Sequence, residues 1–428
     1  MAHPKTCLPS SVLYPESLEE MQELIKKAFT EKIPLRFVGT RYSWEELLCT
    51  SGYLVSTRNF TRVLALDTKK HQVRVQAGIT LRDLHTQLAS YNLALSNQSF
   101  TTGQTLAGAI ATATHGSGHT GTLSDLVVAL ELVDAQGNFY SVNSDSHAHW
   151  LAAARVHLGA LGFIYSITLQ CEPLFVLTHK RSLISWHTCA QQYIGLYNYT
   201  DYCMFMGVAH APTVLYYQWQ RTDKPVTYNL FAQLKDRILF STLISRLGLM
   251  LAHYAPHAAN RIISWSFKFM QQKAHEQYSY KTLSPLAYPN FMYLYEEAEY
   301  GICFSNFAAA LEQTRTLCQQ YTDLVSIITC RFSPGCELSY LGQNYKQDTA
   351  YISVTILTLT DKIQEFYQEF AQLMSNYNGR PHWGKRNTLT KQQLIKIYGE
   401  SVNAFNKVRI ELDPTGLFAN DFIKRCFD

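Results

Sequence analysis

Apolar positions at helical spacing mark the first regular element of the chain. The residues that form this stripe are Leu18, Met21, Leu24, Ile25, Ala28 and Phe29, and intervals of three and four place them on one face of an α-helix. Ser17 precedes the stripe and Glu20 follows three residues later, a spacing that predicts a reciprocal capping box. A second amphipathic helix is predicted over Leu81–Tyr91.

Short runs of β-branched and aromatic residues between turn residues predict strands. The predicted strands are Ile33–Val38, Tyr53–Ser56, Val63–Leu66, Val73–Gln76, Val127–Val133, Phe139–Val142 and Ile164–Gln170. Helices and strands mix without a regular alternation, which favours the α+β class. Beyond residue 175 aromatic residues become frequent and glycines thin out. We therefore predict a domain boundary near Glu172-Pro173.

The segment Phe231–Met270 is rich in apolar residues but is interrupted by Arg237 and Arg246. Its apolar runs are too short for an ordinary membrane span. The default interpretation is a set of buried helices in the second domain. The alternative is an amphipathic anchor lying on a membrane surface, with four residues at the interface: Arg261, Trp265, Lys268 and Phe269.

Composition describes a globular chain long enough for two domains. The 428 residues are 47% hydrophobic and 16% charged, a balance typical of folded proteins. The net charge of +4 comes without a dense stripe of lysine and arginine, so no nucleic-acid partner is expected.

Ten cysteines are scattered along the sequence without a CxxC pair. This pattern predicts no metal site, and it favours free thiols in a reducing compartment over a framework of disulfides. The first eleven residues lack a basic stretch followed by an apolar one. We therefore expect no signal peptide and a cytoplasmic protein.

Two glycine-containing segments suggest close approach to a large anionic ligand. The turn Val38-Gly39-Thr40-Arg41-Tyr42-Ser43 follows a predicted strand, and converging backbone N–H groups in such a turn can bind a pyrophosphate. Residues 102–118 are dense in glycine, alanine and threonine, which lets the main chain approach a flat ligand. Residues 116–121 match GxGxxG literally, but no helix is predicted after them, so a Rossmann fingerprint is rejected.

Two further segments complete the set of motifs. Residues 157–164 form a glycine-punctuated turn that leads into a strand. Near the C-terminus, Gly379-Arg380-Pro381-His382-Trp383-Gly384-Lys385 places a base, an aromatic wall and a cation within one constrained loop.

In this order, the segments resemble the vanillyl-alcohol-oxidase-type (PCMH-type) flavoproteins, specifically their aldonolactone oxidase and alditol oxidase branch. The resemblance runs nearly end to end and includes Leu412-Asp413-Pro414, Gly416 and Phe418 in the closing segment. It implies an FAD-binding lobe over residues 1–175, completed by 386–428. It also implies a cap or substrate domain over 176–385, built on an antiparallel sheet.

The resemblance further implies a reaction and a set of partners. A hydride passes from a CH–OH carbon of a sugar-derived lactone, sugar or polyol to flavin N5. Oxygen, a quinone or a cytochrome then accepts the electrons. Peripheral membrane contact through 231–270 stays open.

By the same resemblance, individual positions acquire cofactor roles. The pyrophosphate would lie against the first loop, Val38–Ser43. The ring and ribityl chain would lie against the second loop, residues 102–118, and the adenosine side would face the third loop, residues 157–164. The residues are Val38, Gly39, Thr40, Arg41, Tyr42 and Ser43; Gly103, Thr105, Gly108, Thr112, His115, Gly116, Ser117 and Gly118; and Gly162 and Ile164.

Four positions become candidates for catalysis. Arg331 and Lys385 are cations that would stabilise negative charge on the reduced ring, and Lys385 could also orient or deprotonate the substrate hydroxyl. His382 is either a flavin contact or a proton acceptor. Thr355 is either a substrate-side residue or an ordinary sheet residue.

The chain departs from the family pattern at two positions. Many relatives carry a flavin-linking histidine where this chain has Tyr42, which predicts non-covalent FAD, with a tyrosyl bond as the lesser alternative. The Glu-x-Arg pattern of a cap strand becomes Thr329-Cys330-Arg331, and Glu337 is the acidic residue that follows it. These departures keep two alternatives open: a lipid-linked sugar oxidase of the decaprenylphosphoryl-ribose oxidase type, and a non-catalytic FAD-binding protein.

Overall fold

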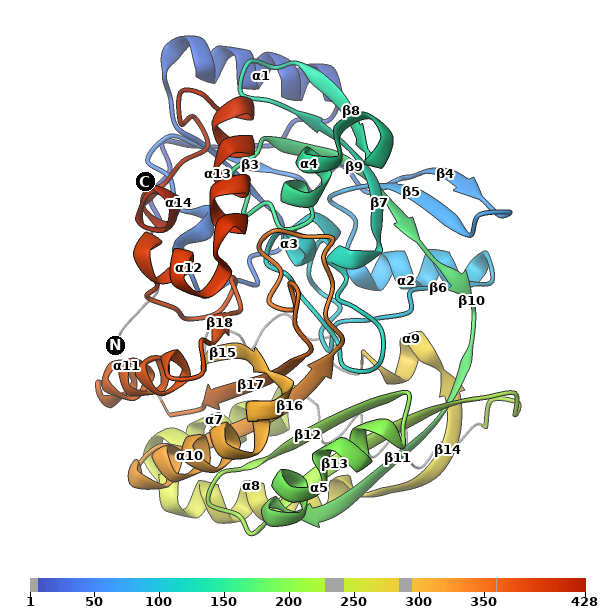
Figure 1. Cartoon of the computed structure of the whole chain (residues 1–428), viewed down its shortest axis with the longest axis vertical. Helices are drawn as coiled ribbons and strands as arrows, with labels where there is room; N and C mark the ends of the chain where they lie inside the picture. The colour runs from blue at the N-terminus through green and yellow to red at the C-terminus, as the bar shows by residue number, and fades with distance from the viewer. Residues whose placement is uncertain (1–6, 228–241, 285–294, 359) are drawn as a thin grey trace.

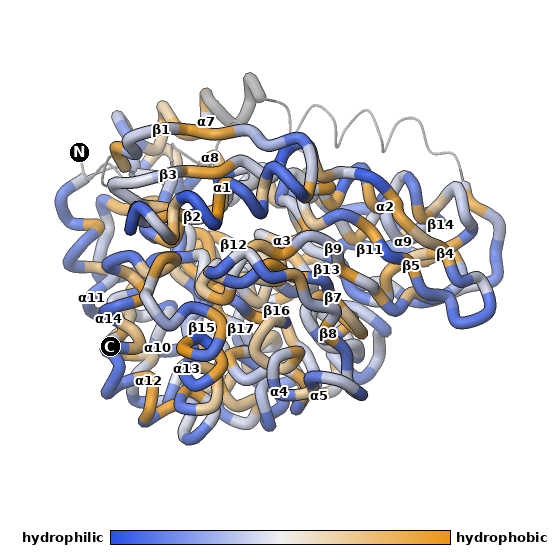
Figure 2. The backbone as a smooth tube through the Cα atoms, turned by 90° about the horizontal axis from the view of Figure 1, so that it is seen from above, coloured by the Kyte–Doolittle hydropathy of each residue, from blue (hydrophilic) through white to orange (hydrophobic). Residues whose placement is uncertain are grey.

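The chain folds into two lobes that face one another across a central cavity (Figure 1). The computed structural model describes residues 7–227, 242–284, 295–358 and 360–428. One lobe combines the N-terminal part with the last helices, and the other contains the middle of the chain. Apolar segments gather among central strands such as β16 and β17, while hydrophilic segments lie mostly at the periphery (Figure 2).

The N-terminal lobe contains two sheets. Three short parallel strands run in the order β1 (Ser11–Leu13), β3 (Tyr53–Ser56), β2 (Leu35–Val38). Five antiparallel strands follow the order β4 (Val63–Asp67), β5 (Gln72–Gln76), β9 (Phe163–Gln170), β7 (Val127–Val133), β8 (Phe139–Asn143). The helices of this part are α1 (Leu18–Glu31), α2 (Leu81–Ser90), α3 (Leu106–Ala111) and α4 (Ser144–Ala154).

The C-terminal helices return to this first lobe. They are α12 (Lys391–Tyr398), α13 (Glu400–Leu412) and α14 (Asp421–Phe427). Phe405 and Phe422 belong to the same buried cluster as Ile110 and Ile167. The backbone of Leu35 also donates a hydrogen bond of 2.9 Å to Leu417. The end of the chain is therefore part of the N-terminal core, although it is distant in sequence.

The second lobe is built on one antiparallel sheet of eight strands. Their order is β14 (Gln272–Tyr278), β11 (Val176–Ser185), β13 (Thr213–Thr222), β12 (Tyr202–Val208), β16 (Ser326–Ser333), β17 (Thr349–Ile356), β15 (Glu296–Cys303), β18 (Arg380–Pro381). The short pair β6 (Leu93–Ala94) and β10 (Glu172–Pro173) bridges the lobes where we expected the boundary.

Helices cover both faces of this cap sheet. Phe205 points to the face packed by α5 (Trp186–Asn198), α10 (Phe307–Gln320) and α11 (Lys362–Ser375). Met204 and Leu215 point to the opposite face, which is covered by Phe267 and Met270 of α8 (Pro256–Met270). Because side chains alternate along a strand, this second face presents Met206 of β12 and Thr329 of β16 to the cavity.

The predicted elements compare closely with the observed ones at most boundaries, with two corrections. Ser17 caps α1 by accepting from the Glu20 backbone, but the Glu20 carboxylate accepts from Glu16 rather than from Ser17. Strand β2 starts at Leu35 instead of Ile33. Pro34 has no N–H to contribute to a sheet, and its carbonyl accepts from Tyr53 at the entry to the pairing.

The apolar segment 231–270 falls partly on residues 231–241, which lie outside the described residues. Its remainder forms α7 (Thr242–Tyr254) and α8. Within the described chain, every helix is too short or too polar to cross a membrane.

The expectation of free thiols is wrong for Cys7 and Cys49, which form a disulfide. Strand β1 lies beside β3, and this pairing brings the start of the chain close to the end of a short 3₁₀ turn (Glu46–Leu48). A proximity of this kind depends on strand pairing, so the cysteine spacing did not reveal it. The other eight cysteines are free.

Candidate active site between the lobes

A cavity of about 700 Å³ lies between the two lobes, within the range of ligand pockets, roughly 300–1,000 Å³. The first loop, Val38–Ser43, lines it with all six residues. From the other predicted loops, the cavity is lined by Thr105, Gly108, Thr112, His115, Gly162 and Ile164. The cap contributes Arg331 and Thr355, and the C-terminal loop contributes His382 and Lys385.

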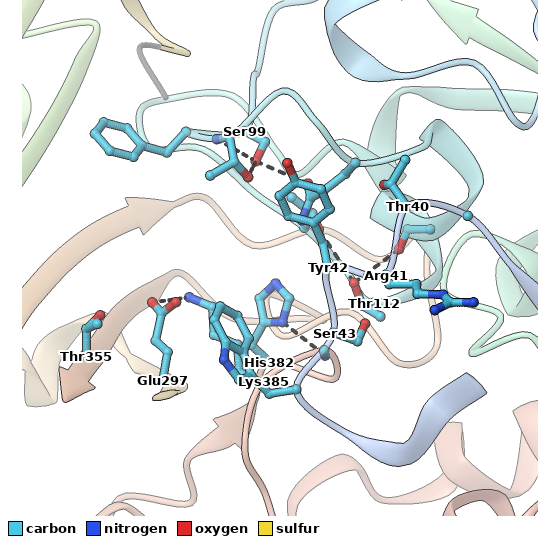
Figure 3. Close-up of a pocket in the computed structure, with 18 of the residues that line it drawn as sticks. Thr40, Arg41, Tyr42, Ser43, Ser99, Thr112, Glu297, Thr355, His382 and Lys385 are labelled. Atoms are coloured by element: carbon cyan, nitrogen blue, oxygen red, sulfur yellow. Dashed lines mark hydrogen bonds and ion pairs between the residues drawn. The ribbon is translucent and has the colours of Figure 1, made fainter. Parts of the chain in front are cut away.

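The first loop and the C-terminal loop hold one another in place. Trp44 N–H donates to the Gly384 carbonyl at 2.9 Å. Asn387 N–H donates to the Glu45 carboxylate at 2.9 Å. Gly384 lies against Ser43, where an added Cβ would come within 3.2 Å of the hydroxyl. The two loops therefore lie side by side at the cavity, although they are more than 300 residues apart in the sequence (Figure 3).

Four of the predicted cofactor residues lie elsewhere. Gly103 packs against Tyr42, since an added Cβ would lie 1.9 Å from the Tyr42 hydroxyl. Its missing side chain therefore makes room for a protein side chain, whereas we expected it to make room for the ligand.

The other three lie outside the main cavity. Gly116 N–H donates to the Asn97 side chain of the same lobe at 2.7 Å, whereas Ser117 and Gly118 join the two lobes. The Ser117 hydroxyl donates to the Cys203 carbonyl and accepts from Phe332 N–H. Gly118 N–H donates to the Phe332 carbonyl at 2.9 Å. We expected small residues here to let the main chain approach a ligand, whereas at Ser117 and Gly118 the segment that approaches is the cap.

Side chains of three adjacent cap strands form two rows on the cavity face. Strand register places Glu297 opposite Thr355, and Thr355 opposite Ile327. The next row contains Glu299, Ser353 and Thr329. Alternate residues of a strand share one face, so Glu297 and Glu299 of β15 both point toward the N-terminal lobe.

A buried chain of charges connects these rows to the second loop. Lys385 Nζ donates to Glu297 Oε1 at 2.6 Å and to Glu299 Oε2 at 2.9 Å. Glu299 Oε1 lies 2.7 Å from His115 Nε2, and His115 Nδ1 lies 2.8 Å from the Gly116 carbonyl. Since a carbonyl can only accept, Nδ1 donates to it. Figure 3 shows the Lys385–Glu297 pair, with Thr355 beyond Glu297.

Electrostatics keep Glu299 ionised despite its burial. Its side chain is 1% exposed, and burial alone would raise its pKa. Lys385 and His115 outweigh that effect and hold the pKa of Glu299 well below its usual range. Both ring nitrogens of His115 therefore face oxygen atoms, the Gly116 carbonyl and the Glu299 carboxylate.

His382 is a neutral imidazole. Burial lowers its pKa well below the usual range, and Lys385, His115 and Arg331 add to the effect against the attraction of Glu299. Its Nδ1 accepts from Gly384 N–H at 3.1 Å. The remaining proton of the neutral ring is therefore on Nε2, which is a donor.

Arg331 lines the cavity without a partner for its charge. Its buried Nε has no hydrogen-bond acceptor, and no ion pair is formed with any other described residue. The Phe100 ring lies 5.7 Å from its guanidinium carbon. A partly buried cation without an ion-pair partner is costly unless a ligand completes it, so this position fits an anionic or carbonyl-bearing ligand such as an isoalloxazine.

Glu297 and Glu299 were missed by sequence reasoning, which looked for an acidic residue near Thr329. Glu337 is not that residue, because its side chain is 75% exposed and it lies near Lys346 at the surface. The signal was present in Glu297-Ala298-Glu299, two carboxylates at strand spacing ahead of an apolar run. Such carboxylates share one face of a strand, and buried acidic residues indicate a site.

The sequence matches known families over nearly its whole length. The family description "D-arabinono-1,4-lactone oxidase" matches residues 167–426, and "FAD binding domain" matches residues 9–143. The chain belongs to the D-arabinono-1,4-lactone oxidase family. As a family member it is an FAD-dependent oxidoreductase of the PCMH-type aldonolactone oxidase branch.

Individual relatives of this lactone oxidase family member span it end to end. An L-gulono-1,4-lactone dehydrogenase of Mycobacterium tuberculosis is 31% identical over 98% of this chain and 96% of its own. The bovine L-gulonolactone oxidase is 28% identical with the same coverage. Among solved structures, cholesterol oxidase from Brevibacterium sterolicum superposes with a TM-score of 0.79 at 16% identity, covering 97% of this chain and 94% of its own. That structural likeness shows the two-lobed fold alone.

Proposed function

We propose that this protein oxidises a CH–OH carbon of a sugar-derived lactone or alditol. The observation that carries the proposal is the meeting of Lys385, Glu297 and Thr355 at the cap side of a cavity that Arg331 also lines. Polar groups that can hold a hydroxyl thus face a site with an uncompensated cation. Relatives of nearly equal length are named for sugar lactones, which supports this substrate class.

Each candidate residue has a role consistent with its contacts. Bound FAD supplies the hydride acceptor. Arg331 would stabilise negative charge on the ring, and the Nε2–H of His382 would donate to a ring or substrate oxygen. Lys385 is already bonded to two carboxylates. We therefore propose that its charge orients the substrate hydroxyl and that it does not act as a base. The Thr355 hydroxyl, in register with Glu297, would contact the substrate.

We also propose that FAD is held without a covalent bond, with the first loop at the pyrophosphate. Tyr42 is the residue of that loop that replaces the linking histidine, and its hydroxyl packs against Gly103. The visible spectrum of the purified protein, repeated after acid precipitation, tests this. Flavin in the supernatant is expected; colour in the pellet would contradict non-covalent binding, and no flavin at all would contradict the cofactor site.

Molecular oxygen is our proposed electron acceptor, because several relatives are named oxidases. One relative is named a dehydrogenase, so the acceptor needs a direct measurement. Lactone-dependent oxygen uptake by the FAD-loaded protein is expected. Turnover that occurs only with a quinone or cytochrome c would contradict this choice.

We propose peripheral contact with a membrane through α7 and α8. Apolar side chains of these helices are about half exposed or more, including Leu247, Met250, Ile262, Trp265 and Phe269. The two helices contain no acidic residue, a composition that suits an anionic lipid surface. Co-sedimentation with anionic vesicles should fall in Trp265→Asp; equal binding of both proteins, or none by either, would contradict the contact.

The cytoplasm remains our proposed compartment. In a reducing compartment the Cys7–Cys49 bond would be open, and thiol titration of freshly isolated, denatured protein should give ten thiols. A count of eight would show that the disulfide forms in the cell and would contradict the cytoplasmic assignment.

A further inference from the structure

Glu297 is the carboxylate that meets the open cavity. Its side chain is 13% exposed, whereas that of Glu299 is 1% exposed. Both oxygens of Glu299 are already bonded, one to His115 and one to Lys385. Glu297 uses Oε1 for both of its bonds, and among the described residues Oε2 accepts none. Glu297 therefore keeps an oxygen available for a ligand.

The position of Glu297 accounts for the uncharged residue at 329. Ser353 pairs with Glu299 on one side and with Thr329 on the other, and its hydroxyl donates to Glu297. The Glu297 carboxylate thus leans over the row that contains Thr329. A glutamate at 329 would extend into the same space, and two carboxylates there would repel. The carboxylate that extends into this space is therefore that of Glu297, carried by β15 instead of β16.

The surrounding contacts fix the orientation of this carboxylate. Lys385 holds Oε1 at 2.6 Å, and Ser353 holds the same oxygen from the other side. The opposite residue in register is Thr355, another cavity-lining side chain. A hydroxyl that donates to Oε2 would therefore lie within reach of both the Thr355 hydroxyl and the Lys385 charge.

We propose that Glu297 is the catalytic base of the oxidation, an inference that rests on the function proposed above. The O–H bond of the reacting carbinol breaks and its proton passes to Glu297 Oε2. The C–H bond breaks with its electron pair, which leaves as hydride to FAD, and a C=O bond forms. Lys385 keeps its proton throughout and acts on the step by holding the base. The substrate is oxidised by two electrons, FAD is reduced by two, and the base later releases its proton to water.

Glu297→Gln tests the proposal, since it keeps the size of the side chain and removes its basicity. The reduction of bound FAD by L-gulono-1,4-lactone is followed anaerobically in a stopped-flow instrument, with FAD affinity measured separately by fluorescence. We expect reduction to slow by about 100-fold or more while FAD affinity stays unchanged. Glu337→Gln is the matched control, because that exposed side chain lies at the surface, and it should reduce like the wild type.

A second-site variant separates chemistry from structure. Adding Thr329→Glu to Glu297→Gln returns a carboxylate from β16, in the row next to that of Glu297, and reduction should recover by about tenfold or more. Wild-type rates in Glu297→Gln would overturn the inference. Loss of FAD binding or of folding in Glu297→Gln, without recovery by Thr329→Glu, would assign Glu297 a structural role and would also overturn it. If the wild type itself is not reduced by any lactone or alditol, the proposed function fails instead.

Discussion

Replacing Lys385 with methionine should destabilise the protein, and the loss should depend on pH. Lys385 Nζ is the one cation shared by Glu297 and Glu299, and its side chain is 10% exposed. Methionine retains most of the aliphatic length but removes the charge. Two carboxylates would then remain in a poorly hydrated site, with His115 in contact with only one of them.

The expected magnitude follows from the geometry. Two carboxylates that shared one ammonium lie roughly 5 Å apart, and they repel by roughly 3 kcal/mol at an effective dielectric constant of about 20. Breaking a buried pair by removing one partner typically costs about 3–5 kcal/mol. We therefore expect Lys385→Met to lower the free energy of unfolding by about 3–5 kcal/mol at pH 7.

The pH dependence has a definite sign. In the wild type, the pKa of Glu299 is held well below its usual range, so its stabilising effect is present above the unfolded-state pKa and is lost as acid protonates it. In Lys385→Met, the largest attraction that opposes the effect of burial on the pKa of Glu299 is lost, and protonation of a carboxylate relieves the repulsion. The difference between the two proteins should therefore shrink as the pH falls from 7 toward 5.

Urea unfolding followed by tryptophan fluorescence, with saturating FAD for both proteins, measures this difference. Lys362→Met is the control, because Lys362 pairs with Asp323 at the same distance of 2.6 Å but both side chains are well exposed. It should change stability little. A loss below about 1 kcal/mol in Lys385→Met, or an equal loss at pH 7 and pH 5, would refute the reasoning.

Three further predictions follow from single contacts. Arg331→Met should make the reduction potential of bound FAD more negative, because a cation that favours the anionic reduced ring is lost; an unchanged potential in a redox titration would contradict its assignment. Gly103→Ala should weaken FAD binding by pushing Tyr42 from its place, and adding Tyr42→Phe should restore part of the affinity, whereas normal affinity in Gly103→Ala would show that the contact is unimportant. Asn420→Ala should lower stability by about 1–3 kcal/mol, because its amide donates to three carbonyls within residues 46–49 and its oxygen caps α14; equal urea midpoints would contradict this.

Local pattern was sufficient for most of the first lobe. The predicted strands Tyr53–Ser56 and Val127–Val133 have the observed bounds, and α2 ends one residue before the predicted end. Each of these elements buries one side against a core, so the spacing of its apolar residues predicts whether it is a helix or a strand. The fold class and the family were confirmed by the matches over residues 9–143 and 167–426.

Pairings between distant segments could not be derived from local pattern. The disulfide between Cys7 and Cys49 depends on a parallel strand pair. Val38–Ser43 line the cavity, and their contact with a pyrophosphate stays a prediction. The positions of Ser117 and Gly118 depend on how the cap docks, which no short motif encodes.

The position of Glu297, the proposed catalytic base, could not be predicted from local pattern either. The family pattern directed attention to position 329, and the chain carries threonine there. The register between β15, β17 and β16 brings Glu297 to the neighbouring row. A sequence shows that Glu297 and Glu299 share a face, but only the sheet order shows that this face adjoins Thr355 and Lys385.

Anaerobic mixing of the FAD-loaded protein with an aldono-1,4-lactone is the most direct test of the proposed oxidation. We expect the visible absorption of oxidised flavin to disappear in the wild type and to persist far longer in Glu297→Gln. A stable oxidised spectrum of the wild type, across lactones and alditols and with FAD firmly bound, would contradict the account.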